Sequence, residues 1–392
     1  MALTSSWAEM DSPRNNYQKE VSMETYYYIA MDIHKKTIAY CIKLQDGTMV
    51  RQGVVPAERK ALRQWVSAVP APWIGAMEAT IFTGWVYDFL KPHAFSLKVA
   101  HPEMVKAITA AKKKNDRSDA ERIADLLRVG LLPECYMAPE ELRELRRILR
   151  YRSHIVRTAV KMKNKISGLL MEVGAPYRKK RLHGRKYFRE LLERIEDVPS
   201  SVVELLRLSR TNLEMFQAVQ KRLIETLRNN ELIRERVERL MTIRGIGEVT
   251  AFTWVLEVGE SERFNSVRHA VSYCGLCSAQ RESAGKERRG PLSKKRNKHL
   301  QTILIEAAKL APYWNPQLAS VHAKELQKGN CNRATLAVAR KLVAYMLAVE
   351  KRQSDFVPRA EEIVSWKSTD HSRLAPPKGR GRDRSILNRM SI

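Results

Sequence analysis

The chain has 392 residues, of which 70 are Lys or Arg and 43 are Asp or Glu, giving a formal net charge of +27. Hydrophobic residues make up 44% of the chain, which excludes an intrinsically disordered protein and allows two or three domains with cores of their own. No apolar run is long enough to span a membrane, and the N-terminus has no stretch typical of a signal peptide, so we expect a cytoplasmic protein. The basic excess favours nucleic acid as the partner, because each neutralised phosphate releases counterions.

The first third of the chain predicts an α/β domain. Residues 1–24 are polar and irregular, and we expect them to be a disordered extension. Strand-like segments follow at 26–33, 37–44 and 48–55, and the Asp46-Gly47 pair indicates a hairpin turn between the last two. The rest of this region predicts a helix near 57–68, a strand ending at Glu78, a helix over 82–91, a strand over 95–101, and helices near 102–112 and 117–129. Three antiparallel strands followed by alternating helices and strands are typical of an RNase H-like domain, which we assign to 25–138.

Four acidic residues of this region stand where a metal-dependent nucleic-acid enzyme places its ligands. Asp32 and Glu78 each follow an apolar strand, and these two strands are neighbours in an RNase H-like sheet. Asp116 and Asp119 are three residues apart at a helix start, so they share one face of that helix. Together the carboxylates could hold one or two Mg²⁺ ions beside a phosphodiester. The alternative is that all four are ordinary surface acids, with Asp116 and Asp119 only stabilising the helix N-terminus.

Residues 139–235 predict a helical coiled-coil arm made of two long antiparallel helices. The first helix has apolar residues at heptad spacing, interrupted at Arg152 and Lys163, and ends at Gly174-Ala175-Pro176. The second stripe consists of Leu213, Phe216, Leu223 and Leu227. Between the helices, residues 178–189 contain seven Lys or Arg residues and no acid, which favours phosphate contact over a solvated loop. The residues that we assign to nucleic-acid binding there are Arg178, Lys179, Lys180 and Arg181.

Residues 236–352 predict a mostly helical domain, and 353–392 predict a flexible basic tail. Gly245 and Gly247, between two helical segments, fit a helix–hairpin–helix, in which glycines let backbone amides approach a phosphate; a simple tight turn is the alternative. Further along, Ser283 lies in a basic region that could neutralise a phosphate. The basic residues concerned are Lys286, Arg288, Arg289, Lys294, Lys295, Arg296 and Lys298.

Several of these segments resemble one known family. MDIHKK, MEAT and NDRSDA, followed far downstream by IRGIGEVTA and YCGLCSAQRESAG, resemble the DEDD transposases of bacterial insertion sequences, a group of bridge-RNA-guided serine recombinases. The resemblance implies a RuvC-like first domain, with Mg²⁺ held by the four acids named above. It also implies a C-terminal transposase domain in which Ser283 attacks DNA and forms a covalent phosphoserine link. The chain departs from the family at Ala284, where glycine or serine is commoner, and at Arg296, where glycine is usual.

The resemblance further implies the partners of the protein. These are DNA, as element ends and target, a guide RNA, and other copies of the chain in a homodimer or tetramer, with no membrane, at the bacterial nucleoid. Because no base lies near Ser283 in the sequence, we expect the acids to come from the other domain, folded over from a second protomer. One alternative is a metal-dependent structure-specific nuclease resembling a Holliday-junction resolvase, in which water attacks. Another is a nucleic-acid-binding scaffold without catalysis.

Overall fold

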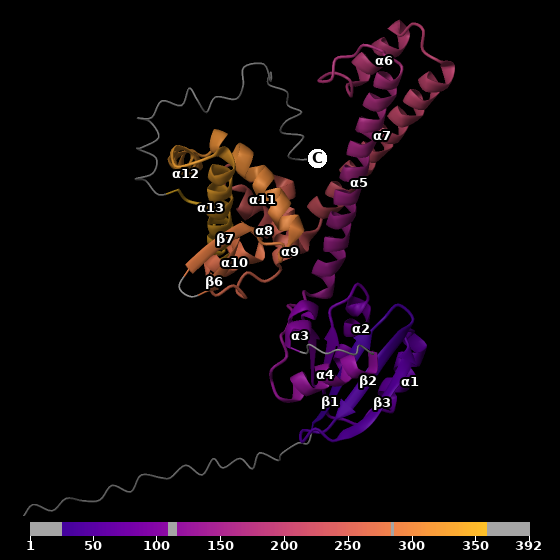
Figure 1. Ribbon diagram of the computed structural model, residues 1–392, viewed down its shortest axis with the longest axis vertical. Helices are drawn as coiled ribbons and strands as arrows, with labels where there is room; N and C mark the ends of the chain where they lie inside the picture. The colour runs from indigo at the N-terminus through magenta and orange to yellow at the C-terminus, as the bar shows by residue number, and fades with distance from the viewer. Residues whose placement is uncertain (1–25, 109–115, 284–285, 359–392) are drawn as a thin grey trace, which may run out of the picture. The chain divides into compact units, whose positions relative to one another are not determined.

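The computed structural model describes residues 26–108, 116–283 and 286–358, with side chains for all of these except 116–117 and 280–289. The chain divides between Met137 and Ala138 into two compact units (Figure 1). The predicted extension at 1–24 and most of the predicted tail at 353–392 lie outside the described residues.

The first unit is built on a five-stranded sheet in the order β3-β2-β1-β4-β5. β1 (Tyr27–Ile33), β2 (Thr37–Lys43) and β3 (Met49–Pro56) are antiparallel, whereas β4 (Trp73–Glu78) and β5 (Ser96–Ala100) run parallel to β1. All five predicted strands are confirmed to within one or two residues. The strand order and directions are compatible with the predicted RNase H-like fold.

Helices cover both faces of this sheet (Figure 1). The helices of the unit are α1 (Arg59–Ser67), α2 (Thr83–Leu90), α3 (Pro102–Ile108) and α4 (Asp116–Arg128), with a 3₁₀ turn η1 (Lys91–His93) after α2. Met31 and Met77 belong to the core formed with α1 and α2. The opposite face carries Ala30, Ala76 and Ala100, which pack with α3 and α4. Because these side chains are small, α4 lies close to the sheet on that face.

The second unit starts with the predicted pair of long helices, α5 (Glu140–Glu172) and α7 (Ser200–Arg228), which pack along each other. The short helix α6 (Arg185–Arg194) follows α5 in the chain and lies at the tip of the arm (Figure 1). Their shared core includes Ile166, Leu170, Leu206 and Leu213. Arg152, which interrupts the apolar seam in the sequence, is only 5% exposed, and burial lowers the pKa of its guanidinium to about 10.

The remainder of this unit is helical apart from one ribbon. Its helices are α8 (Glu231–Met241), α9 (Glu248–Val258), α10 (Val267–Tyr273), α11 (Lys298–Leu310), α12 (Pro316–Gln327) and α13 (Cys331–Arg352), with a 3₁₀ turn η2 (Ala311–Tyr313). Every residue of α9 is buried. The ribbon of β6 (Ser278–Ser283) and β7 (Lys286–Leu292) was not predicted, because its charged sequence lacks the apolar alternation of a half-buried strand. Within the described residues, no helix is both long and apolar enough to cross a membrane.

Candidate active site

Asp32 and Glu78 are neighbours at the carboxyl edge of the sheet. β1 and β4 are parallel and in register up to the pair Met31–Met77, and each acid is the next residue of its strand. The register pair Ala30–Ala76 belongs to the core shared with α4. Because side chains alternate along a strand, both acids extend toward the α4 face, two positions after these alanines. Asp32 is 5% exposed and Glu78 is half-buried.

Local contacts hold the backbone and side chains at this edge. His34 Nε2 lies 3.2 Å from Asp32 Oδ2. Thr83 Oγ1 donates a hydrogen bond of 2.7 Å to the carbonyl of Glu78 and accepts one of 2.8 Å from the N–H of Thr80. These bonds fix the turn between β4 and α2, so Glu78 is presented from an ordered backbone. Nothing in the sequence predicts a contact between His34 and Asp32, which becomes visible only in the fold.

Helix α4 runs with its amino end toward the same edge. Its carboxyl end is fixed at the β2–β3 turn, where the guanidinium of Arg128 lies 3.0 Å from the position of a Cβ on Gly47. Further back, Lys43 Nζ contacts Asp125 Oδ2 at 2.9 Å, and Lys43 is the register partner of Tyr28 near the start of β1. The helix is therefore antiparallel to β1. At 1.5 Å per residue, it carries Asp119 about 9 Å beyond Asp125, toward the Asp32 edge.

Lys43 anchors this helix, a role that the sequence alone did not predict. Its ammonium group is buried and also contacts Glu121 Oε1 at 3.1 Å. Burial alone would lower the pKa of Lys43, but hydrogen bonds to Asp125 and Glu121 outweigh it and raise the pKa. Similarly, burial opposes ionisation of Asp125, but hydrogen bonds from Arg128 and Lys43 hold its pKa below the ordinary value. The sequence contains one sign of this contact: Glu121 and Asp125 are four residues apart, so both carboxylates lie on one face of the helix.

The structure brings two of the four predicted ligands together and directs a third toward them. Asp119 accepts a 3.0 Å hydrogen bond from Arg122 Nη1. Asp116 is the first residue of α4, and its side chain lies outside the described set. Among the side chains that the structure describes, no group of three or more His, Cys, Asp or Glu is arranged to hold a metal ion. Carboxylate oxygens are ligands that suit Mg²⁺, so the metal role of all four residues stays a prediction.

Ser283 is the last residue of β6, and its register partner across the ribbon is Lys286. The base of the ribbon is tied to the helical core of the second unit. The N–H of Ser293 donates a 3.0 Å hydrogen bond to the carbonyl of Cys277, and Gln301 Nε2 donates one of 2.6 Å to Gly275. The side chains of 280–289 are not described, so the roles of Ser283, Lys286, Arg288 and Arg289 stay predictions.

The basic residues after the ribbon, Lys294, Lys295, Arg296 and Lys298, are all exposed. The turn that carries them is ordered: Ser293 Oγ accepts a 3.2 Å hydrogen bond from the N–H of Lys295, and Arg296 Nη1 donates one of 3.0 Å to the Ser293 carbonyl. The aliphatic part of Arg296 fills the space that a Cβ would need at Gly275, whose φ is 70°. Arg296, at which the chain departs from the family pattern, therefore packs against this glycine as well as carrying charge.

A buried carboxylate that the sequence did not predict, Glu257, contacts Asn297 at the end of this turn. Glu257 on α9 is 1% exposed and accepts two 2.8 Å hydrogen bonds from Arg150 of α5 and one of 2.8 Å from Asn297 Nδ2. Asn297 in turn caps α11 by accepting hydrogen bonds from the N–H groups of His299 and Leu300. Burial opposes ionisation of Glu257, but the hydrogen bonds and charge of Arg150 hold its pKa below the ordinary value. One side chain thus joins the arm, the central helix and the start of α11.

Two family models match the chain, in the order of the two predicted catalytic segments. Residues 29–174 match the model of the DEDD transposases of the IS110 type, described as "Transposase". Residues 237–323 match a model described as "Transposase IS116/IS110/IS902 family". The first match contains the four acids and the second contains Ser283. This chain belongs to the IS110/IS116 transposase family.

Individual relatives align over most of their own length. A "Transposase for insertion sequence element IS1111A" of Coxiella burnetii is 27% identical over 348 residues, covering 86% of this chain and 92% of the relative. A "Transposase for insertion sequence element IS1328" of Yersinia enterocolitica is 25% identical over 322 residues, covering 80% and 93%. A "Probable family 20 transposase" of Pseudomonas aeruginosa is 24% identical over 310 residues, covering 77% and 90%. The similarity therefore extends through both units and the arm.

In this transposase, Gly245 and Gly247 form the tight turn between α8 and α9. Gly245 has a φ of 101°, and a Cβ added to it would lie 2.6 Å from the Cβ of Ala311. At the start of α9, Glu248 accepts hydrogen bonds of 2.6 and 2.9 Å from Arg228, so a carboxylate already lies at that helix N-terminus. The positive φ and the close approach of Ala311 explain why residue 245 is a glycine. The predicted role of Gly245 and Gly247 in nucleic-acid binding stays a prediction.

We expect Gly245→Ala to lower the free energy of unfolding of this transposase by about 2–4 kcal/mol, from a disfavoured backbone conformation and overpacking. The matched change is Gly168→Ala, in the interior of α5, where a Cβ meets nothing within 4 Å. That substitution is expected to raise stability by about 0.5–1 kcal/mol, because alanine favours the helix. Urea unfolding of both variants, followed by circular dichroism, measures the difference. Equal stabilities would show that Gly245 has no packing role.

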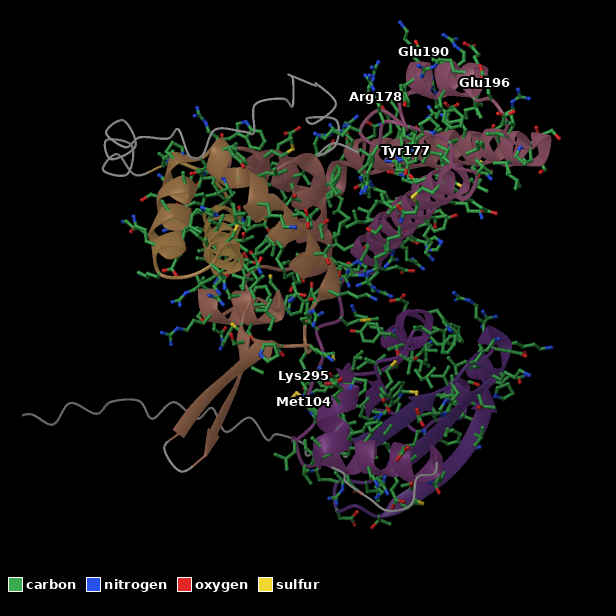
Figure 2. The ribbon with its side chains drawn as sticks, turned by 45° about the horizontal axis from the view of Figure 1, so that its top comes forward. Met104, Tyr177, Arg178, Glu190, Glu196 and Lys295 are labelled. Carbon is green, nitrogen blue, oxygen red and sulfur yellow. The ribbon has the colours of Figure 1, made fainter. Side chains whose placement is uncertain are left out.

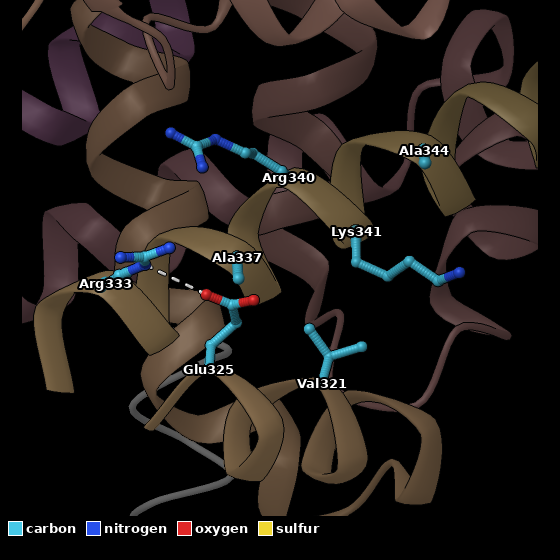
Figure 3. A pocket seen from close by; sticks show the side chains of 7 residues that line it. All are labelled: Val321, Glu325, Arg333, Ala337, Arg340, Lys341 and Ala344. Atoms are coloured by element: carbon cyan, nitrogen blue, oxygen red, sulfur yellow. Dashed lines mark hydrogen bonds and ion pairs between the residues drawn. The ribbon is translucent and has the colours of Figure 1, made fainter. Parts of the chain in front are cut away.

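A separate groove of about 480 Å³ lies between α12 and α13 of the transposase. Its polar residues are Glu325, Arg333, Arg340 and Lys341, and Arg333 Nε donates a 3.2 Å hydrogen bond to Glu325 (Figure 3). A hydrogen bond from Lys328 and the neighbouring Arg333 hold the pKa of Glu325 below its ordinary value. The groove thus presents an ion-paired, basic surface and contains none of the predicted catalytic residues.

Proposed function

We propose that this transposase cuts and rejoins DNA at the ends of its insertion sequence through a covalent bond between Ser283 and a DNA phosphate. The observation that carries the proposal is the arrangement at the sheet edge. Asp32 and Glu78 lie at the carboxyl ends of neighbouring parallel strands on one face, and α4 directs Asp119 toward them. Such a concentration of carboxylates in a chain of net charge +27 suits a site that acts on phosphates.

In the proposed step, the Ser283 oxygen attacks phosphorus and the bond from phosphorus to one strand's oxygen breaks. The serine proton is lost, and the departing oxygen gains a proton to become a hydroxyl. Because the phosphoserine keeps the energy of the original ester, the hydroxyl of another strand can displace the serine and restore a phosphodiester. Lys294, Lys295 and Lys298 would bind the neighbouring phosphates, since they are exposed on the turn after the ribbon.

The proposed ligands Asp32, Glu78, Asp116 and Asp119 offer only oxygen donors, which fits Mg²⁺. When bound, the ion would stabilise the additional negative charge on the phosphate in the transition state. The protein's own contribution is the fixed edge on which these residues stand. His34 and Arg122 contact Asp32 and Asp119, so each side chain has a cationic or hydrogen-bonding partner that metal binding would replace.

The proposal includes DNA element ends and target, a guide RNA, and a homodimer or tetramer working at the nucleoid in the bacterial cytoplasm. The guide RNA is supported by the resemblance of the motif segments to the DEDD transposases. Nucleic acid in general is supported by the net charge of +27. Seven Lys or Arg residues without an acid in 178–189, including Arg178, Lys179, Lys180 and Arg181, provide a second phosphate-binding surface on the arm.

The test is a covalent-adduct assay. Protein purified with its bound RNA is incubated with labelled element-end DNA and Mg²⁺ and then run on a denaturing gel. We expect a shifted protein–DNA band that Ser283→Ala abolishes and that Ser278→Ala, a matched change at the other end of β6, retains. Cleaved DNA without an adduct, produced equally by Ser283→Ala, would instead indicate the resolvase-like nuclease, in which water attacks.

A further inference from the structure

The tip of the arm contains a pocket of about 790 Å³ that the reaction above does not use. It is formed by the end of α5, the basic segment after it, α6, and the residues that follow α6. Tyr177, Arg178, Glu190 and Glu196 all lie at this end of the arm (Figure 2). The volume falls in the range of small-molecule sites, roughly 300–1,000 Å³.

One part of the pocket wall is cationic and is organised around Tyr187. The ring of this buried tyrosine lies 5.4 Å from the guanidinium carbon of Arg181 and 6.0 Å from that of Arg194. Its hydroxyl accepts a 2.7 Å hydrogen bond from the N–H of Arg178, which fixes the start of the basic segment. Within the described part of the chain, no carboxylate forms an ion pair with Arg178, Arg181 or Arg194. Their positive charge is therefore available to an anionic group.

Another part of the wall is acidic. Glu190, Glu196 and Asp197 line the same pocket, and among the described residues only Glu190 has an ion-pair partner, Lys186 at 3.9 Å. The acids of the pocket form no ion pair with its arginines in the described part of the chain, so both kinds of charge line one ligand-sized space. A simple anion would satisfy the arginines but would meet the carboxylates. The ligand that fits carries both an anionic group and hydrogen-bond donors.

We propose that the arm-tip pocket binds one unpaired nucleotide whose base carries an exocyclic amino group. The phosphate would contact Arg178 and Arg181, the base would lie along Tyr177, and its amino group would donate to Glu190 or Glu196. Carboxylates accept hydrogen bonds from such amino groups, as they do from cytosine N4. Uracil presents carbonyl oxygens there instead, which carboxylates repel. The seven basic residues of 178–189 favour a nucleotide over other zwitterionic ligands. The inference rests on the proposed function, since it takes nucleic acid as the partner.

The test compares hexanucleotides that differ only at the base edge. Fluorescein-labelled rC6, rU6, dC6 and dU6 are titrated with the full chain at about 150 mM salt, and binding is followed by anisotropy. We expect the cytosine oligomers to bind roughly fivefold or more tightly than the uracil oligomers. The ribose and deoxyribose pairs distinguish an RNA source from a DNA source, because a 2′-hydroxyl contact would favour rC6 over dC6.

Matched variants separate the pocket from general basic attraction. Glu190→Ala/Glu196→Ala is expected to bring the cytosine-to-uracil ratio to about one. Arg178→Ala/Arg181→Ala is expected to weaken both oligomers more than Arg185→Ala/Arg189→Ala, which removes two basic charges from residues that neither line the pocket nor pair with its acids. Circular dichroism confirms that each variant is folded.

Three results would overturn the inference: equal affinity for cytosine and uracil in the parent protein, an unchanged ratio in the glutamate variant, or equal losses in the two basic variants. The readout is binding to short oligomers, so it is independent of Ser283 and of strand cleavage. A protein that discriminates between the bases but forms no adduct would refute the proposed reaction and leave the pocket assignment standing. Adduct formation without discrimination would do the reverse.

Discussion

Asp32→Asn is expected to reduce DNA cleavage by about a thousandfold or more, equivalent to roughly 4 kcal/mol of transition-state stabilisation. Asparagine keeps the shape of the side chain but removes the negative charge from a proposed ligand that is only 5% exposed. Nucleic-acid binding should change little, because the basic surfaces are not altered. Cleavage of element-end DNA and electrophoretic mobility shifts, measured on the same protein, separate these two effects.

The control for this change is Asp46→Asn, which alters the same chemical group in the β2–β3 turn. Asp46 Oδ1 accepts a 2.8 Å hydrogen bond from the N–H of Thr48, and an asparagine oxygen can accept the same bond. We therefore expect full activity from Asp46→Asn. Comparable activity in the two variants would remove Asp32 from the catalytic site, and with it the argument from the shared sheet edge. Added chelator should reproduce the Asp32→Asn defect in the parent protein.

The first unit follows closely from local sequence rules. Near-continuous apolar runs define β1 and β2, and Asp46-Gly47 fixes the hairpin, where Gly47 has a φ of 95°. Strand register then places Asp32 beside Glu78 without any further information. These features were predictable because each depends on neighbours in sequence or on the two-residue repeat of a strand.

Lys43 and Glu257 were not predictable, because their partners lie far away in the chain. Lys43 is the charged last residue of an apolar strand, where a lysine usually reaches water, yet it contacts Asp125, 82 residues later. Glu257 sits near the end of an apolar helix, where an acid usually faces water, but it meets Arg150, which is 107 residues earlier. Only the tertiary fold shows that these charges are buried and paired. The same holds for the arm-tip pocket, whose wall combines α5, α6 and their connecting segments.

Two of the buried ionic contacts in the described part of the chain orient elements that carry predicted site residues. In the first unit, Lys43 fixes the carboxyl end of α4 and so directs its amino end, with Asp119, toward the sheet edge. In the second unit, Glu257 holds Asn297, the residue that starts α11 directly after the basic turn. Buried ion pairs often add little net stability, but removing one partner is costly because the other stays buried and unpaired.

The pH dependence of the free energy of unfolding should show the contact between Glu257 and Arg150. The folded pKa of Glu257 lies below the ordinary glutamate value of about 4.3, because Arg150 favours the carboxylate in spite of burial. Its contribution to stability is therefore complete above that value and is lost as the pH falls through the lower, folded pKa. Urea midpoints measured from pH 7 down to acidic pH should decrease more steeply in the parent protein than in Glu257→Gln, which has no charge to lose.

Glu257→Ala is expected to lower the free energy of unfolding by about 1–3 kcal/mol, the usual cost of leaving donors without a buried acceptor, because the Arg150 side chain is 47% exposed and can be hydrated. The change leaves the guanidinium of Arg150 and the amide of Asn297 without the carboxylate that accepts three 2.8 Å hydrogen bonds from them. The control is Arg150→Met/Glu257→Leu, which removes both charges and fills the space. Arg146, 4.0 Å from the Glu257 carboxylate, keeps its 2.7 Å hydrogen bond to the Leu256 carbonyl, so the double variant should recover most of the loss. Thermal and urea unfolding decide the matter: a double variant as unstable as Glu257→Ala would mean that the damage comes from lost packing around α9 rather than from an unpaired charge.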